Sequence, residues 1–456
     1  MADGALPGFR DFYPDEFAQR AHIFKAWREV ARRYAFVEYD GPPLEPLDLY
    51  KKKSGDEIVG QLYNFVDKGD REVALRPEMT PTFARMVAAK ANAIRKPVRW
   101  FSIPQLFRYE RAQRGRLREH YQLNVDIVGE PSELADAELL SVAIDIMREL
   151  GLSSEDVRAR VSDRRLLNAI LESLGVDAVQ FAAVYAVLDK IARTPANVSR
   201  EKLAAAGLPD ATIDRIIALA AAKGVATLRS EFGASVGVAP HLERFERYLA
   251  YLHALGVGEW VDLDLSIVRG LAYYTGIVFE LFDAKGEWRA ICGGGRYDTL
   301  LQSLGNVDLP ALGFGMGDVV LGELLRERGL MPAKAGTPAE LFVVGGDGVL
   351  DHPIADALTL ARQLRRAGFS VDHVMNAEKY QAQSSRNQVD SAKKSGARAA
   401  IYFENADTVM VLGLAGRILE APKGEFAAAP LLAGDVNALA ALRSWFDSTI
   451  SSRNID

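Results

Sequence analysis

The chain has 456 residues, of which 49% are hydrophobic and 25% are charged, and this composition is typical of a water-soluble protein with two or three domains. No apolar run reaches the roughly 18–20 residues of a membrane span, and the first residues lack the pattern of a signal peptide. The single cysteine, Cys292, excludes a disulfide within the chain, as is typical of the reducing cytoplasm.

The charge pattern is uneven. The net charge of −6 counts mildly against a nucleic-acid partner. However, arginines gather in one short segment, namely Arg108, Arg111, Arg114, Arg116 and Arg118. The six histidines show no metal-ligand spacing, so we expect no metal held by protein side chains.

Periodicity predicts the elements of the first two thirds of the chain. We expect a second helix to begin at Thr80, with Thr80 as its N-cap and Pro81 as its first residue. The stretch from about residue 177 to residue 253 is rich in alanine and helical throughout, so it is interpreted as a helical insertion. The predicted helices are 16–34, 132–150 and 163–174, and the predicted strands are 36–39, 98–103, 106–110, 121–128, 157–161, 261–267 and 275–282.

A change of pattern near residues 328–339 indicates a linker, since Pro332, Gly336 and Pro338 gather there. Beyond it, strands and helices alternate, which predicts a small α/β domain with a largely parallel sheet.

Polar residues occupy one face of the predicted hairpin. Gln122, Asn124 and Asp126 alternate with apolar residues, and Arg108 shares a strand face with Glu110. Together they form a polar floor with cationic, acidic and amide groups. A solvated sheet face would give the same pattern, so both interpretations stay open.

The loop between the two strands, residues 111–118, is basic. Such loops are usually only solvated, but this one lies beside the polar floor, where arginine forks suit bidentate contact with phosphates.

Five blocks occur in an order that resembles the class II histidyl-tRNA synthetases. They are LPGFRD at 6–11, RPEMT at 76–80, FRYER at 107–111, VRGLAYY at 268–274 and GGRYD at 294–298. The resemblance covers nearly the whole chain. It implies an α+β fold with an antiparallel sheet flanked by helices in a catalytic domain at 1–327, followed by an anticodon-binding-like α/β domain at 338–456.

The resemblance implies a histidine–tRNA ligase, which activates histidine with ATP to histidyl-adenylate and transfers it to tRNA. It implies ATP with Mg²⁺ as a substrate, a cytoplasmic location and a homodimer with Pro43 at its interface. The alternative is a regulatory subunit of ATP phosphoribosyltransferase that binds histidine without charging tRNA. A class II synthetase for another small amino acid is a third, less favoured, interpretation.

The resemblance also implies roles for individual residues. Arg108 and Arg269 are expected to be catalytic. The expected histidine-binding residues are Glu78, Thr80, Arg108, Gln122, Asp126, Arg269, Tyr273, Tyr274 and Gly294. The expected ATP-binding residues are Arg108, Glu110, Arg116, Gly295 and Arg296. The expected contacts with the tRNA acceptor end are Arg111, Gln113, Arg114 and Arg116.

Two positions depart from the family pattern. Ala272 stands where many relatives carry an acid. The third class II motif usually ends in an arginine that holds the ATP γ-phosphate, whereas here residues 313–317 run into Asp318-Val319-Val320. Either another cation substitutes, with Arg116 or Arg296 as candidates, or ATP turnover is impaired.

Overall fold

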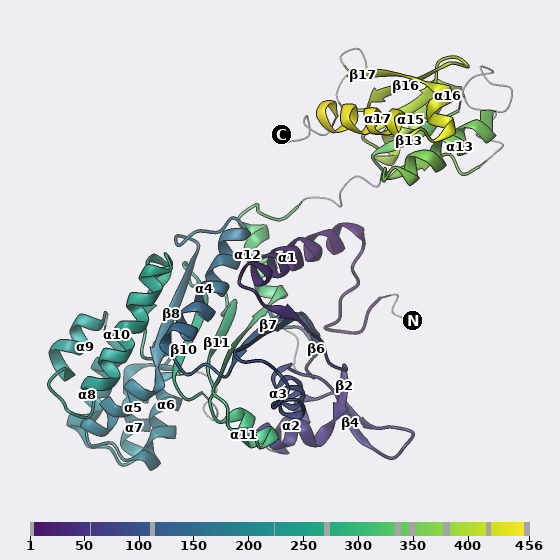
Figure 1. Cartoon of the computed structure of the whole chain (residues 1–456). Helices are drawn as coiled ribbons and strands as arrows, with labels where there is room; N and C mark the ends of the chain where they lie inside the picture. Colours follow the sequence, from purple (N-terminus) through teal and green to yellow (C-terminus); the bar gives the residue numbers. More distant parts are fainter. Residues whose placement is uncertain are drawn as a thin grey trace. The chain divides into compact units, whose positions relative to one another are not determined.

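The computed structural model describes residues 4–54, 56–109, 115–222, 224–268, 274–332, 339–345, 353–376, 384–415 and 421–450 (Figure 1). The chain divides into two compact units, Met1–Ala333 and Lys334–Asp456. No helix in the described ranges is long and apolar enough to cross a bilayer.

The first unit is built on a large sheet, which has nine strands within the described residues. Its strands follow the order β1-β5-β7-β12-β11-β10-β8-β9, and β6 pairs with β7 beside this path. All neighbours are antiparallel except the pairs β1–β5 and β8–β9. The strands are β1 Val37–Glu38, β5 Val98–Ser102, β6 Gln105–Phe107, β7 Glu119–Val128, β8 Val157–Asp163, β9 Val261–Leu263, β10 Ile277–Asp283, β11 Cys292–Arg296 and β12 Ala311–Gly317.

Helices cover the apolar face of this sheet. Leu123 and Val125 of β7 and Phe314 of β12 pack in the main core with Trp27 of α1 and Leu140 of α4. Helix α1 begins with Pro14 and an acidic first turn and ends with two arginines, as the helix dipole favours. The helices outside the insertion are α1 Pro14–Arg33, α2 Leu47–Ser54, α3 Thr80–Ala89, α4 Glu133–Glu149, α5 Arg164–Ser173, α11 Leu300–Gly305 and α12 Asp318–Glu327.

The segment expected to be a helical insertion contains helices and no strand among its described residues, 177–222 and 224–253. Figure 1 shows these helices gathered on one side of the first unit, beyond β8. They are α6 Phe181–Leu188, α7 Ala196–Ala205, α8 Asp210–Ala221, α9 Val225–Phe232 and α10 Ala239–Ala254.

A small sheet lies outside the large one. It has the order β2-β4-β3 and is antiparallel, with β2 Leu44–Pro46, β3 Asn64–Val66 and β4 Glu72–Leu75. The sequence patterns did not predict it, because its strands are too short to show a period.

Within its described residues, the second unit contains a five-stranded mixed sheet of order β14-β13-β15-β16-β17. Strand β13 is parallel to both neighbours, whereas β15, β16 and β17 are antiparallel. Its elements are β13 Leu341–Val344, α13 Pro353–Arg366, β14 Val371–His373, α15 Ser385–Ser395, β15 Ala399–Phe403, β16 Thr408–Gly413, β17 Lys423–Ala427, α16 Ala428–Ala433 and α17 Val436–Thr449. The prediction of a largely parallel sheet is therefore wrong for the last three strands, β15, β16 and β17, which form an antiparallel meander.

Two local expectations are corrected as well. Helix α3 begins at Thr80 itself, with Met79 as the N-cap and no side-chain cap. The alternation over residues 261–267 yields only the three-residue strand β9, because a turn at Leu265 and Ser266 ends it.

Candidate active site

The face of the large sheet opposite the main core carries a polar hollow. In the antiparallel pairing, Gln122, Asn124 and Asp126 of β7 stand opposite Gly317, Gly315 and Gly313 of β12. Residues directly opposite one another share a face of the sheet. A methyl group added to Gly315 would lie 2.8 Å from Cδ of Gln122, so the glycines leave the space that the polar side chains border.

A cavity of about 120 Å³ lies over this hollow, and we call it the inner cavity. Asp126 at its floor is only 4% exposed and accepts a hydrogen bond from the Tyr297 hydroxyl. That contact fixes the carboxylate beneath the cavity. The inner cavity is lined by Glu78, Thr80, Arg108, Gln122, Asn124, Asp126, Tyr274, Gly293, Tyr297, Gly313, Phe314 and Gly315.

Glu78 and Thr80 reach the inner cavity because Arg76 holds the segment before α3. The Arg76 guanidinium is nearly buried and donates to the carbonyl oxygens of Gly41, at 2.7 Å, and Gln105, at 3.1 Å. The backbone carbonyl of Arg76 in turn accepts from the amide of Phe107 in β6, at 2.9 Å. Arg76 is therefore a structural cation, and the residues that follow it face the cavity.

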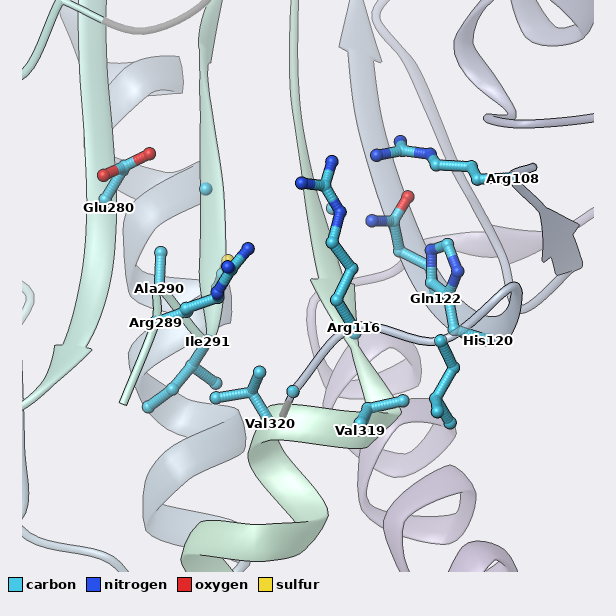
Figure 2. Close-up of a pocket in the computed structure, with 16 residues that line it drawn as sticks. Arg108, Arg116, His120, Gln122, Glu280, Arg289, Ala290, Ile291, Val319 and Val320 are labelled. Atoms are coloured by element: carbon cyan, nitrogen blue, oxygen red, sulfur yellow. The ribbon is translucent and has the colours of Figure 1, made fainter. Parts of the chain in front are cut away.

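A second cavity of about 460 Å³ adjoins the first, and we call it the outer cavity. Four residues line both cavities, namely Arg108, Gln122, Gly293 and Gly315. Figure 2 shows Arg108, Arg116 and Arg289 around the outer cavity, with Val319 and Val320 at one end. Its lining residues are Arg108, Gly115, Arg116, Leu117, His120, Gln122, Glu280, Arg289, Ala290, Ile291, Cys292, Gly293, Gly315, Gly317, Val319 and Val320.

Positive charge dominates the outer cavity. Burial, followed by the charges of Arg108 and two further arginines, lowers the pKa of His120 from 6.5 to about 3. The imidazole is therefore neutral at physiological pH. Arg108 is held at the junction of the two cavities by a hydrogen bond from its Nε to the carbonyl oxygen of Pro77, at 3.1 Å. An arginine in that position suits an anion that spans both cavities.

The structure brings most of the described site candidates together. Glu78, Thr80, Gln122, Asp126 and Tyr274 line the inner cavity, and Arg116 lines the outer one. Arg108 lines both. The candidates Glu110, Arg111, Gln113, Arg114, Arg269 and Tyr273 lie outside the described residues.

Two of the predicted glycines lie elsewhere. Gly294 stands opposite Phe279 and Phe314, whose side chains are in the main core, so it faces away from the cavities. Gly293 takes the expected place, because neighbouring residues of a strand point to opposite faces. Gly295 is on the cavity face but lies against Ile277 and Val278 and lines neither cavity.

The expectation that Arg296 binds ATP does not fit its surroundings. Its side chain is fully buried and forms an ion pair with Asp136, at 2.7 Å, and another with Asp298, at 3.2 Å. It also donates to the carbonyl oxygens of Glu130 and Ser132. With its donors thus engaged inside the fold, Arg296 joins α4 to β11 and is not a site residue.

The sequence patterns missed several residues that line the cavities. Tyr297 belongs to the GGRYD block, but no pattern in the sequence gives it a role of its own, although it orients Asp126. His120 shares the period-two pattern of Gln122 and Asn124, which is a signal that would have found it. Arg289 and Glu280 give no such signal, because they are single charged residues on different parts of a hairpin.

Among the described residues, no group of three or more His, Cys, Asp or Glu side chains is gathered to hold a metal ion. The cavities instead present arginines, two side-chain amides and carboxylates. That set suits an amphoteric small molecule in the inner cavity and a phosphate-bearing one in the outer cavity.

Comparisons with known proteins agree with this chemistry. A family model described as histidyl-tRNA synthetase matches residues 8–317. The chain is 45% identical over 402 residues to the histidine–tRNA ligase of Opitutus terrae, covering 88% of this chain and 90% of that protein. It is 42% identical over 371 residues to the chloroplastic/mitochondrial histidine–tRNA ligase of Arabidopsis thaliana, covering 81% and 75%.

Solved structures show the same fold. Histidyl-tRNA synthetase from Nostoc sp. PCC 7120 superimposes with a TM-score of 0.77 at 23% identity, over 95% of this chain and 98% of that one. An ATP phosphoribosyltransferase regulatory subunit/histidyl-tRNA synthetase from Bacillus halodurans C has a TM-score of 0.71 at 23% identity, over 88% and 98%. At such identities the likeness concerns the fold.

Proposed function

The chain belongs to the histidyl-tRNA synthetase family, and we propose that its two adjoining cavities hold the substrates of histidine activation. It is an aminoacyl-tRNA synthetase, a histidine–tRNA ligase, like the relatives that match most of its length. In the first half-reaction histidine and ATP give histidyl-adenylate and pyrophosphate, and in the second the histidyl group passes to tRNA. The observation that carries the proposal is Arg108, which lines both cavities.

The inner cavity suits histidine. Asp126 and Gln122 provide acceptors and donors for a ring with two nitrogens, and Glu78 provides a carboxylate for the α-ammonium group. Tyr297 holds Asp126 in place from below. A pocket of this kind rejects apolar side chains of similar shape, because their binding would leave its polar groups unpaired.

The outer cavity suits ATP. The attack of the histidine carboxylate on the α-phosphate brings two anions together, and a fixed arginine at the junction offsets their repulsion. Arg108 has that position, and Arg116 adds charge further along the cavity. Magnesium enters with ATP as part of the substrate. The expected roles of Arg269 and Glu110 belong to residues outside the described ranges and stay part of the proposal.

The remaining assignments rest on the family resemblance. We propose that the basic loop of residues 111–118, which contains Arg116, meets the acceptor end of tRNA, and that the second unit meets the anticodon. We also propose a homodimer in the cytoplasm. The homodimer is supported by exposed apolar side chains on β1 and on the small sheet, namely Val37, Leu44, Phe65 and Val66, of which Leu44 directly follows Pro43 in the chain.

The regulatory alternative has less support. The relative with that description shares the fold at 23% identity, which does not separate the two functions. The relatives with 38–45% identity over at least 80% of this chain are described as histidine–tRNA ligases.

The test is ATP–pyrophosphate exchange with magnesium and each amino acid in turn, without tRNA. We expect exchange with histidine alone. Asp126→Asn should raise the KM for histidine on the order of 100-fold while the KM for ATP stays unchanged, because the lost carboxylate faces only histidine. The amide oxygen still accepts from Tyr297, so the variant should fold.

Asp189→Asn is the matched control, because Asp189 is exposed and lines neither cavity. It should behave as the wild type does. Histidine binding without exchange would favour the regulatory alternative. Equal rises in both KM values for Asp126→Asn would remove Asp126 from histidine recognition.

A further inference from the structure

Among the residues that the structure describes, none supplies a cation at the end of the outer cavity where the family pattern leads one to expect an arginine. Helix α12 begins there, and its first residues are Asp318, Val319 and Val320. Asp318 does not serve the cavity, because it binds Arg10, at 2.8 Å, and the amide of Tyr121, at 2.9 Å. The cavity wall at this end is therefore formed by two valines (Figure 2).

Arg289 stands on the neighbouring wall. It comes from the turn between β10 and β11, is exposed, and lines the outer cavity with Arg108 and Arg116 (Figure 2). Among the residues that the structure describes, none forms a hydrogen bond or ion pair with its guanidinium, whereas Arg296 is held on all sides. Arg289 thus keeps its donors for a ligand.

The turn that carries Arg289 is anchored. The indole Nε1 of Trp288 donates to a carboxylate oxygen of Glu327 at the end of α12, at 2.9 Å. At the start of the turn, Asp283 accepts from Arg328, at 3.1 Å. On the other side, the amide of Ile291 donates to the carbonyl of Leu281, at 2.8 Å. The turn is therefore tied to the same helix whose first residues border the cavity.

We propose that Arg289 binds the β- and γ-phosphates of ATP and replaces the arginine absent from the start of α12. In the activation step a carboxylate oxygen of histidine forms a bond to the α-phosphorus. The bond from that phosphorus to the α,β-bridging oxygen breaks, and its electron pair leaves with pyrophosphate. Arg289 stabilises the negative charge on this leaving group. The inference rests on the proposed function, in which the outer cavity holds ATP.

Binding measurements test this role without depending on catalysis. Calorimetry with Arg289→Ala should show roughly 10- to 100-fold weaker binding of Mg–ATP and of inorganic pyrophosphate, as the loss of charge-assisted hydrogen bonds implies. Binding of AMP, which lacks the two outer phosphates, should be unchanged. The affinity of Arg289→Lys for Mg–ATP and for pyrophosphate should lie between those of the wild type and Arg289→Ala, because lysine keeps the positive charge but lacks the planar guanidinium fork.

The matched control is Lys285→Ala, which removes a positive charge from the same turn. Lys285 is exposed, forms an ion pair with Glu327, at 3.7 Å, and does not line the cavity. It should bind all three ligands as the wild type does. In exchange assays Arg289→Ala should raise the KM for ATP and for pyrophosphate but not for histidine.

The binding and exchange results distinguish the role of Arg289 from the proposed function of the chain. Equal losses of AMP and ATP affinity would place Arg289 beside the adenosine and overturn the inference, and so would unchanged ATP binding. A wild-type protein that binds ATP but exchanges nothing would count against the proposed function alone, since the contrast between ATP and AMP would still decide the role of Arg289.

Discussion

Two arginines near β11 illustrate how surroundings decide the role of a residue. Arg296 is buried against Asp136, and burial raises the pKa of that carboxyl to about 6 although the arginine charge opposes the rise. Arg289 is exposed at a cavity. A buried arginine without its acid is strongly destabilising, whereas an exposed one is available to a ligand. The two residues are chemically identical, so only their contacts distinguish a structural cation from a binding one.

His120 gives a prediction at the same scale. Its pKa is about 3 in the folded protein against 6.5 ordinarily, so the fold holds the neutral ring. The resulting stability is present above pH 6.5 and is lost as the pH falls toward 3. Between those values the wild type should lose stability relative to His120→Asn, with a slope approaching about 1.4 kcal/mol per pH unit for one proton.

Unfolding temperatures of both proteins at pH 7.5 and pH 4.5 would show this difference, and the NMR titration of the His120 ring would measure its pKa directly. A ring that titrates near pH 6.5 would contradict the prediction, since it would mean that neither burial nor the arginines act on it.

At the scale of elements, the register between strands decides which side chains meet. The period-two pattern of β7 was enough to assign Gln122, Asn124 and Asp126 to one face, because alternation is a local property of a strand. The same pattern did not assign the glycines of β11 and β12, which have no side chain to alternate. Pairing with β7 and β10 assigned Gly315 to the cavities and Gly294 to the core.

Two alanine substitutions should therefore have opposite effects. In Gly294→Ala the new methyl group meets the backbone of Phe314 in the core, with Cα at 2.7 Å, and should destabilise the protein by about 1–3 kcal/mol. In Gly315→Ala the three atoms nearest to the new methyl group all belong to the end of the Gln122 side chain, which can rotate to make room. That variant should keep its unfolding temperature and lose affinity for histidine.

Thermal unfolding and histidine-dependent exchange on both variants measure the contrast. If Gly294→Ala were as stable as the wild type and Gly315→Ala were unstable, the faces assigned to the two strands would be wrong.

At the scale of the whole molecule, the chain forms two units, each with a core of its own. The core of the first contains Trp27, Val125 and Phe314, and that of the second contains Leu341, Ile401 and Phe446. Separate cores are the property that allows units to fold independently. We therefore expect the two proposed functions, amino-acid activation and tRNA recognition, to be separable as well.

A chain that ends at Pro332 should fold, keep histidine-dependent ATP–pyrophosphate exchange, and charge tRNA far less efficiently than the full chain. Circular dichroism, exchange and aminoacylation assays on the same preparation check each part. Loss of exchange by a folded first unit would show that the second unit contributes to activation.

The order of the motifs along the chain implied the α+β class through the family resemblance. Local patterns were sufficient for the helical character of residues 177–253 and for the polar face of β7, because both depend on residues close in sequence. The structure was needed for the pairing of distant strands, which assigns Gly293 to the cavity wall and Gly294 to the opposite face. It was also needed for the burial that removed Arg296 from the site and for the anchored turn that brings Arg289 to it. These features depend on contacts between segments that are far apart along the chain, and no local period records such contacts.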